Sequence, residues 1–158
     1  MANENMGVVI GENQRYVWMR ARKTSVSEIP VTITEESPAE NTIAAGVSAL
    51  LGTHGINIGV QTLMSEGNSA REILEDGLRD VTFIDLVGCD VEETLFYISK
   101  GVPVFALTGA NEAVLLVGYD SSSVIIYDPA VGASYRKSFE DAREMFEAAG
   151  NVFLTYLS

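Results

Sequence analysis

The sequence predicts one α+β domain, in which a helical first half packs on an antiparallel sheet formed by the second half. Two observations lead to this prediction. Helix caps followed by apolar residues at helical spacing are concentrated before residue 101. Apolar strands dominate the rest, and short turns join them, which favours antiparallel hairpins over a β-α-β alternation. A chain of 158 residues has the size of one domain and can bury a core without metal or disulfide staples.

The N-terminal part, residues 1–34, is predicted to be an extension that forms one globular unit with residues 35–158. Gly7 to Met19 is typical of a β-hairpin, because two apolar-rich stretches flank the turn residues Gly11 to Gln14. No internal repeat and no low-complexity linker divides the chain. We therefore expect a single structural domain.

Four helices are predicted from their cap residues. The first begins with Ser37-Pro38-Ala39-Glu40, a capping box with proline at the first helical position, and Gly55 ends it. The other three run from a polar cap to a glycine, from Ser69 to Gly77, from Asp90 to Gly101 and from Ser138 to Gly150.

Six apolar stretches are predicted to be strands of the sheet. They are Val81 to Leu86, Val102 to Thr108, Ala113 to Tyr119, Val124 to Tyr127, Ser134 to Lys137 and Val152 to Leu157. The Gly109-Ala110-Asn111 and Asp120-Ser121-Ser122-Ser123 connections are short, so the strands that they join should form antiparallel hairpins.

The charge of the chain argues against a nucleic-acid partner. The formal net charge is −12, from 22 acidic and 10 basic residues. The one concentration of basic residues comprises Arg15, Arg20, Arg22 and Lys23, and we interpret it as a solvated strand edge.

No apolar run approaches the roughly 20 residues of a membrane-spanning helix, so no membrane insertion is predicted. The first residues also lack the pattern of a signal peptide, so we expect that, if the natural protein is exported, this chain is an excised domain or is already trimmed.

Motifs for cofactor or metal chemistry are absent from the sequence, which contains no Walker loop, GxGxxG, CxxC or HExxH. We predict no cofactor and no metal. The single histidine, His54, falls in the last turn of the first helix, where a histidine stabilises the helix dipole or caps carbonyl groups. The single cysteine, Cys89, lies between acidic and apolar neighbours without a partnered imidazole and is interpreted as a structural thiol.

The stretch from Gly101 to Gly132 contains three linked motifs: "GVPV", then "AVLLVGYD", then "VIIYDPAVG". This order resembles the second half of the papain-like cysteine peptidases that remove double-glycine leader peptides. The helix from Asn41 to Leu51, followed by His54-Gly55, is similar to the helix that carries the catalytic cysteine of that family. The resemblance covers roughly residues 35–157 and implies the papain-like cysteine peptidase fold.

The catalytic positions of the family fall on four residues of this chain. The resemblance places the nucleophilic cysteine at Thr42, the oxyanion glutamine at Glu36, the histidine at Glu112 and the aspartate at Asp128. Only the last position keeps the family's residue type. A threonine hydroxyl is too weakly acidic to replace a thiolate without a base, and Glu36 would repel a developing oxyanion.

These departures imply a degenerate peptidase without catalytic residues. We expect its former cleft, lined by Glu36, Thr42, Glu112 and Asp128, to bind a peptide or another protein. From the resemblance alone, we expect the domain to be part of a larger bacterial surface or exported protein.

Two alternatives remain open from the sequence. The domain could be a spacer or self-association unit without a ligand. It could also be a hydrolase or cation site that uses Glu112 and Asp128, although magnesium and calcium usually require more oxygen ligands than two carboxylates supply. An open groove between the Thr42 helix and the Glu112 strand would favour the binding function.

Overall fold

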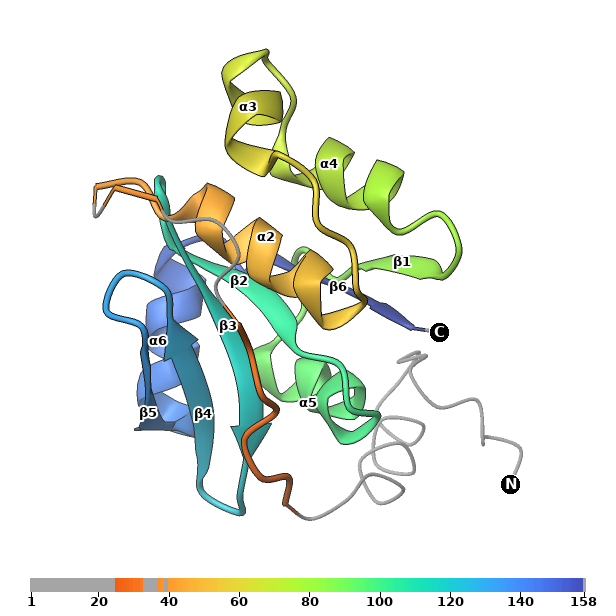
Figure 1. The fold of residues 1–158 in the computed structure, drawn as a ribbon. Helices are drawn as coiled ribbons and strands as arrows, with labels where there is room; N and C mark the ends of the chain where they lie inside the picture. The colour runs from red at the N-terminus through yellow and green to blue at the C-terminus, as the bar shows by residue number, and fades with distance from the viewer. Residues whose placement is uncertain (1–24, 33–36, 39, 158) are drawn as a thin grey trace.

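A computed structural model describes residues 25–32, 37–38 and 40–157 (Figure 1). The predicted hairpin of residues 7–19, the basic residues 15–23 and the predicted site residue Glu36 lie outside the described residues. None of the helices within the described ranges is long and apolar enough to cross a membrane.

The elements follow the predicted order, with helices first and a sheet that the second half dominates. They are α2 (Ile43–Thr53), α3 (Val60–Ser65), α4 (Ala70–Gly77), β1 (Thr82–Asp85), α5 (Val91–Ser99), β2 (Val104–Gly109), β3 (Glu112–Tyr119), β4 (Ser123–Asp128), β5 (Ala133–Ser138), α6 (Phe139–Ala148) and β6 (Phe153–Leu157). The strand order in the sheet is β1-β6-β2-β3-β4-β5, and every neighbouring pair is antiparallel. The predicted α+β class is confirmed.

The sheet is covered by helices on both of its faces, as Figure 1 shows for α2 on one side and for α5 and α6 on the other. Strand β3 therefore has two buried faces. Leu115 and Val117 belong to the core under α2, whereas Val114 and Leu116 belong to the core under α5 and α6. Burial on both faces explains why β3 is a continuous apolar run without the alternation of a half-exposed strand.

Three of the predicted helices begin at their predicted caps. The Ser69 hydroxyl accepts a hydrogen bond from the Glu72 N–H at 3.2 Å, and the Ser138 hydroxyl accepts one from the Asp141 N–H at 3.1 Å. The Glu93 carboxylate accepts from the N–H of Asp90, the residue that precedes α5. These are side-chain caps that satisfy donors of the first helical turn.

The predicted start of the first helix is wrong by five residues, because the prediction begins the helix at Pro38. Helix α2 begins at Ile43, and Ser37 lies outside it. The Ser37 hydroxyl still satisfies a donor of the first turn, because it accepts from the Ala45 N–H at 2.9 Å from this more distant position. Helix α3 was not predicted. Only Val60 of its six residues is buried, so the sequence has no apolar residues repeating at helical spacing there.

Residues 25–32 run along β3 beyond the end of its pairing with β2 (Figure 1). Val26 exchanges two backbone hydrogen bonds with Tyr119, of 2.9 and 3.1 Å, and the Ile29 N–H donates to the Val117 carbonyl at 2.8 Å. This close approach requires a glycine on β3. A Cβ atom at Gly118 would lie 2.8 Å from the Val26 carbonyl oxygen and 2.9 Å from Ile125 Cδ1.

We therefore predict that Gly118→Ala destabilises the domain by about 1–3 kcal/mol, as overpacking of a filled site does. Gly59→Ala is the control, because a Cβ there meets nothing closer than 3.7 Å. Urea unfolding of the two variants measures the difference. Equal stability of Gly118→Ala and the wild type would show that residues 25–32 do not pack against β3 in this way.

Candidate functional site

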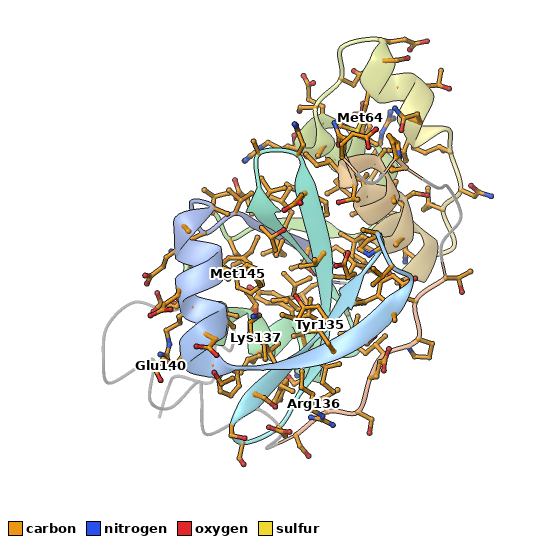
Figure 2. All side chains as sticks on the ribbon, turned by 90° about the vertical axis from the view of Figure 1, so that its left-hand side faces the viewer. Met64, Tyr135, Arg136, Lys137, Glu140 and Met145 are labelled. Atoms are coloured by element: carbon orange, nitrogen blue, oxygen red, sulfur yellow. The ribbon has the colours of Figure 1, made fainter. Side chains whose placement is uncertain are left out.

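A cavity of about 260 Å³ lies where the start of α2 meets the start of β3 and the end of β4. Its lining residues are Thr42, Thr108, Glu112, Ala113, Val114, Asp128, Ala130, Tyr135 and Met145. We call it the carboxylate cavity. The structure thus brings together Thr42, Glu112 and Asp128, although they come from opposite halves of the chain. In Figure 2, the labelled side chains Tyr135 and Met145 extend from the neighbouring elements β5 and α6.

Thr42 immediately precedes α2, and its side chain joins the helix to the sheet. The residue is only 3% exposed. Its hydroxyl oxygen accepts a hydrogen bond from the Ala113 N–H at 3.0 Å and donates to the Ala113 carbonyl at 3.4 Å. The Thr42 N–H donates to the Asn111 carbonyl at 2.9 Å. Both the donor and an acceptor site of the hydroxyl are therefore engaged with β3, and we call this pair of bonds the Thr42–Ala113 clasp.

The first turn of α2 has also engaged most of its backbone donors. The Ile43 N–H donates to Asn41 Oδ1 at 3.2 Å, and the Ala45 N–H donates to the Ser37 hydroxyl at 2.9 Å. The Gly46 N–H donates to the Thr42 carbonyl at 3.0 Å. Free N–H groups at a helix start attract anions. Here the chain's own oxygens occupy these positions, which leaves fewer donors for a ligand or an oxyanion.

The two acidic residues of the cavity lie at the same end of two neighbouring antiparallel strands. Glu112 is the first residue of β3 and is exposed, and Asp128 is the last residue of β4 and is half-buried. Asp128 Oδ1 accepts from the Ala130 N–H at 2.9 Å, which holds the turn after β4. Within the described part of the chain, no Lys, Arg or His side chain forms an ion pair with either carboxylate.

The tyrosines beside Asp128 are held in their neutral form. Burial, and then the negative charge of Asp128, raise the pKa of Tyr135 above its ordinary value. The pKa of Tyr127 is raised by burial first, then by Asp128 and by Glu28. Neither tyrosine therefore contributes a negative charge at neutral pH. Among the described residues, no three His, Cys, Asp or Glu side chains gather in a group that could hold a metal ion.

A second cavity, of about 280 Å³, lies on the other side of the start of α2. It is lined by Pro38, Asn41, Ala44, Gln61, Met64 and Ser65, and we call it the Met64 cavity. Figure 2 shows Met64 far from Tyr135 and Met145, so the two cavities open at different places. The sequence did not predict this second cavity, because α3, which supplies half of its lining, has no recognisable helical pattern.

The single histidine and the single cysteine line neither cavity. His54 follows the last residue of α2, as expected for a residue at a helix end, and its Nε2 lies 2.9 Å from Asp80 Oδ2. Its ring centroid lies 5.3 Å from that of Tyr156. Cys89 is partly buried and belongs to the turn before α5.

Comparison with known proteins identifies the fold. No protein family matches the sequence, and no curated protein sequence is similar to it. A C39-like peptidase from Bacillus anthracis is similar in structure, with a TM-score of 0.67, 18% sequence identity, and coverage of 82% of this chain and 94% of that one. A double glycine motif protease from an AMS/PCAT transporter, solved in complex with the leader peptide, has a TM-score of 0.57 and 17% identity, and the match covers 83% of this chain and 94% of the protease.

This chain therefore has the fold of the C39, papain-like peptidases. The prediction from the three motifs between Gly101 and Gly132 is confirmed at the level of the fold.

We predict that Thr42→Val destabilises the domain by about 1–3 kcal/mol, because the substitution leaves the buried Ala113 N–H without an acceptor. Thr42→Ser keeps the hydroxyl and should lose less. Thr82→Val, at an exposed strand position, is the matched control and should stay within about 0.5 kcal/mol of the wild type. Chemical denaturation measures all three. A Thr42→Val variant as stable as Thr82→Val would show that the clasp does not stabilise the domain.

At the other end of α2, the contact between His54 and Asp80 is predicted to stabilise the domain in a pH-dependent way. The hydrogen bond from His54 is the largest factor that lowers the pKa of the exposed Asp80 carboxyl. Because the Asp80 pKa is lower in the folded than in the unfolded protein, the contact stabilises the folded state fully when the pH is above the unfolded-state pKa. This stabilisation is lost as the pH falls through the folded-state pKa. Asp80→Asn should therefore lower the melting temperature at pH 5 and lose this effect near pH 2. Asp76→Asn is the control, and an Asp80→Asn effect of equal size at both pH values would contradict the assignment.

Proposed function

We propose that this domain is a non-catalytic peptide-binding module built on the C39 peptidase fold. The observation that carries the proposal is that two cavities and an engaged hydroxyl group occur together at the start of α2. Two cavities flank it, while the hydroxyl at the nucleophile position is engaged in the Thr42–Ala113 clasp.

The free energy needed to break the clasp supports the proposal that Thr42 is not a nucleophile. To attack a substrate, the Thr42 hydroxyl would have to leave Ala113, and the buried Ala113 N–H would lose its acceptor at a cost of about 1–3 kcal/mol. The hydroxyl proton points to the Ala113 carbonyl, which is not a base. Among the described residues, no histidine, cysteine or lysine lines the cavity to activate the hydroxyl. A hydroxyl nucleophile without an imidazole base is at a further disadvantage, because Glu112 and Asp128 oppose the negative charge of an oxyanion.

The two cavities support peptide binding through their size and position. Volumes of about 260 and 280 Å³ lie just below the roughly 300–1,000 Å³ of sites that enclose a complete small molecule. Each cavity therefore suits one side chain. An extended peptide that crosses the start of α2 would place side chains in both. The similar double glycine motif protease was solved with a leader peptide, which makes a peptide the natural first ligand to test.

The absence of cleavage is tested with synthetic double-glycine leader peptides, followed by mass spectrometry. The expected result is an intact peptide after prolonged incubation, under conditions in which an active C39 peptidase cleaves it. Cleavage that disappears in Thr42→Ala would overturn the non-catalytic part of the proposal. Cleavage that persists in Thr42→Ala would indicate a contaminating peptidase.

Binding is tested with fluorescently labelled peptides and variants that fill each cavity. Ala130→Trp and Ser65→Trp place a large ring at exposed positions in the walls of the carboxylate cavity and the Met64 cavity. Each should weaken binding at least tenfold, because the ring occupies the volume that a peptide side chain needs. Ala148→Trp, exposed on α6 outside both cavities, should bind as the wild type does. Absence of binding by any peptide would favour the spacer function.

The placement of this module in a larger surface or exported protein stays a prediction. Cell fractionation followed by detection with an antibody against the domain would test it.

A further inference from the structure

The carboxylate cavity has an unbalanced charge. Among the described residues that line it, Glu112 and Asp128 are acidic, and none is a lysine, arginine or histidine. The described arginines with ion pairs are engaged elsewhere, Arg71 with Asp85, Arg136 with Asp120 and Arg143 with Glu92. The cavity is thus a concave surface with two negative charges that no described cation neutralises.

Lys137 lies on β5 two residues after Tyr135, which lines this cavity, and it too is engaged. Its ammonium lies over the ring of Tyr135, 5.9 Å from the centroid, and Figure 2 shows the two side chains on the same strand. This geometry is that of a cation–π contact. Lys137 forms no ion pair with Glu112 or Asp128 among the described contacts.

Apart from Thr42 and Thr108, the other described residues that line the cavity are apolar or aromatic. Ala113, Val114, Ala130 and Met145 contribute aliphatic surface, and Tyr135 contributes a phenol ring. A lysine or arginine side chain matches such a site, because its aliphatic stem packs against apolar surface and its head pairs with carboxylates. A bare metal ion matches it less well, since two carboxylates supply fewer oxygen ligands than magnesium or calcium usually takes.

The Met64 cavity has a different chemistry. None of the described residues in its lining is charged, and Pro38, Ala44 and Met64 give it an apolar surface. A peptide that crosses the start of α2 would therefore meet an acidic cavity on one side and a neutral, largely apolar one on the other. The difference gives a bound peptide a preferred direction.

We infer that the carboxylate cavity binds a lysine or arginine side chain of the peptide, while the Met64 cavity binds an apolar one. This inference rests on the proposed peptide-binding function and adds the class of peptide that the site selects.

The test compares four labelled peptides of equal length in anisotropy titrations. One carries a lysine and an apolar residue at positions that reach the two cavities, and three replace the lysine with norleucine, glutamine or glutamate. The lysine peptide should bind at least tenfold more tightly than the norleucine peptide. Glu112→Gln and Asp128→Asn should each reduce this preference about three- to tenfold, as removal of one partner from a charged hydrogen-bonded pair does. Asparagine keeps the oxygen that accepts from the Ala130 N–H, so the turn should be preserved.

Glu75→Gln is the charge-matched control, because Glu75 is exposed on α4 and lines neither cavity. It removes the same charge from a protein of net charge −12 and should leave the preference unchanged. An equal loss in Glu75→Gln and Glu112→Gln would show that the preference comes from overall charge, and would overturn the inference.

The remaining outcomes separate this inference from the proposed function. Peptides that bind without any preference for lysine, or with a preference that Glu112→Gln and Asp128→Asn do not alter, would overturn the basic-side-chain inference and leave peptide binding intact. If no peptide binds, the proposed function fails and this inference fails with it.

Discussion

The pair of hydrogen bonds between Thr42 and Ala113 determines how the two halves of this domain meet. Helix α2 supplies much of the core on one face of the sheet, and β3 is the strand that both cores share. The clasp joins the start of α2 to the start of β3, at the point where the carboxylate cavity opens. Thr42, which the sequence motifs predict to be the nucleophile position, is thus a structural contact here. Reactivity and this contact compete for the same hydroxyl group, which is why the function that we propose is binding.

The parts of the fold that the sequence predicts are those determined by local chemistry. A serine or aspartate before a helix satisfies nearby N–H groups, so the starts of α4, α5 and α6 follow from a few residues each. The strands follow from their apolar runs and short turns. The start of α2 does not follow in this way, because its donors are satisfied by Ser37 from outside the helix and by the geometry of the β3 junction. A capping pattern cannot reveal a contact that tertiary structure creates.

The candidate site was predictable only in part, for a similar reason. Thr42, Glu112 and Asp128 fall on positions that motifs in the sequence mark, and the structure places them around one cavity. Tyr135 and Met145 complete that cavity from β5 and α6, and no motif marks them, since their role depends on how these elements fold back. The Met64 cavity depends on α3, a six-residue helix with one buried side chain. Short elements of this kind are stabilised by packing, and their residues carry little periodicity.

The central claim is that the Thr42 hydroxyl is engaged with Ala113 and is not available for chemistry. Amide hydrogen exchange of Ala113, measured by NMR, tests this claim most directly. The account predicts that the Ala113 N–H exchanges as slowly as the amides of the sheet core and that its exchange accelerates selectively in Thr42→Val, because the acceptor is then lost. Rapid exchange of Ala113 in the wild-type protein would show that the hydroxyl is free, and would contradict the account.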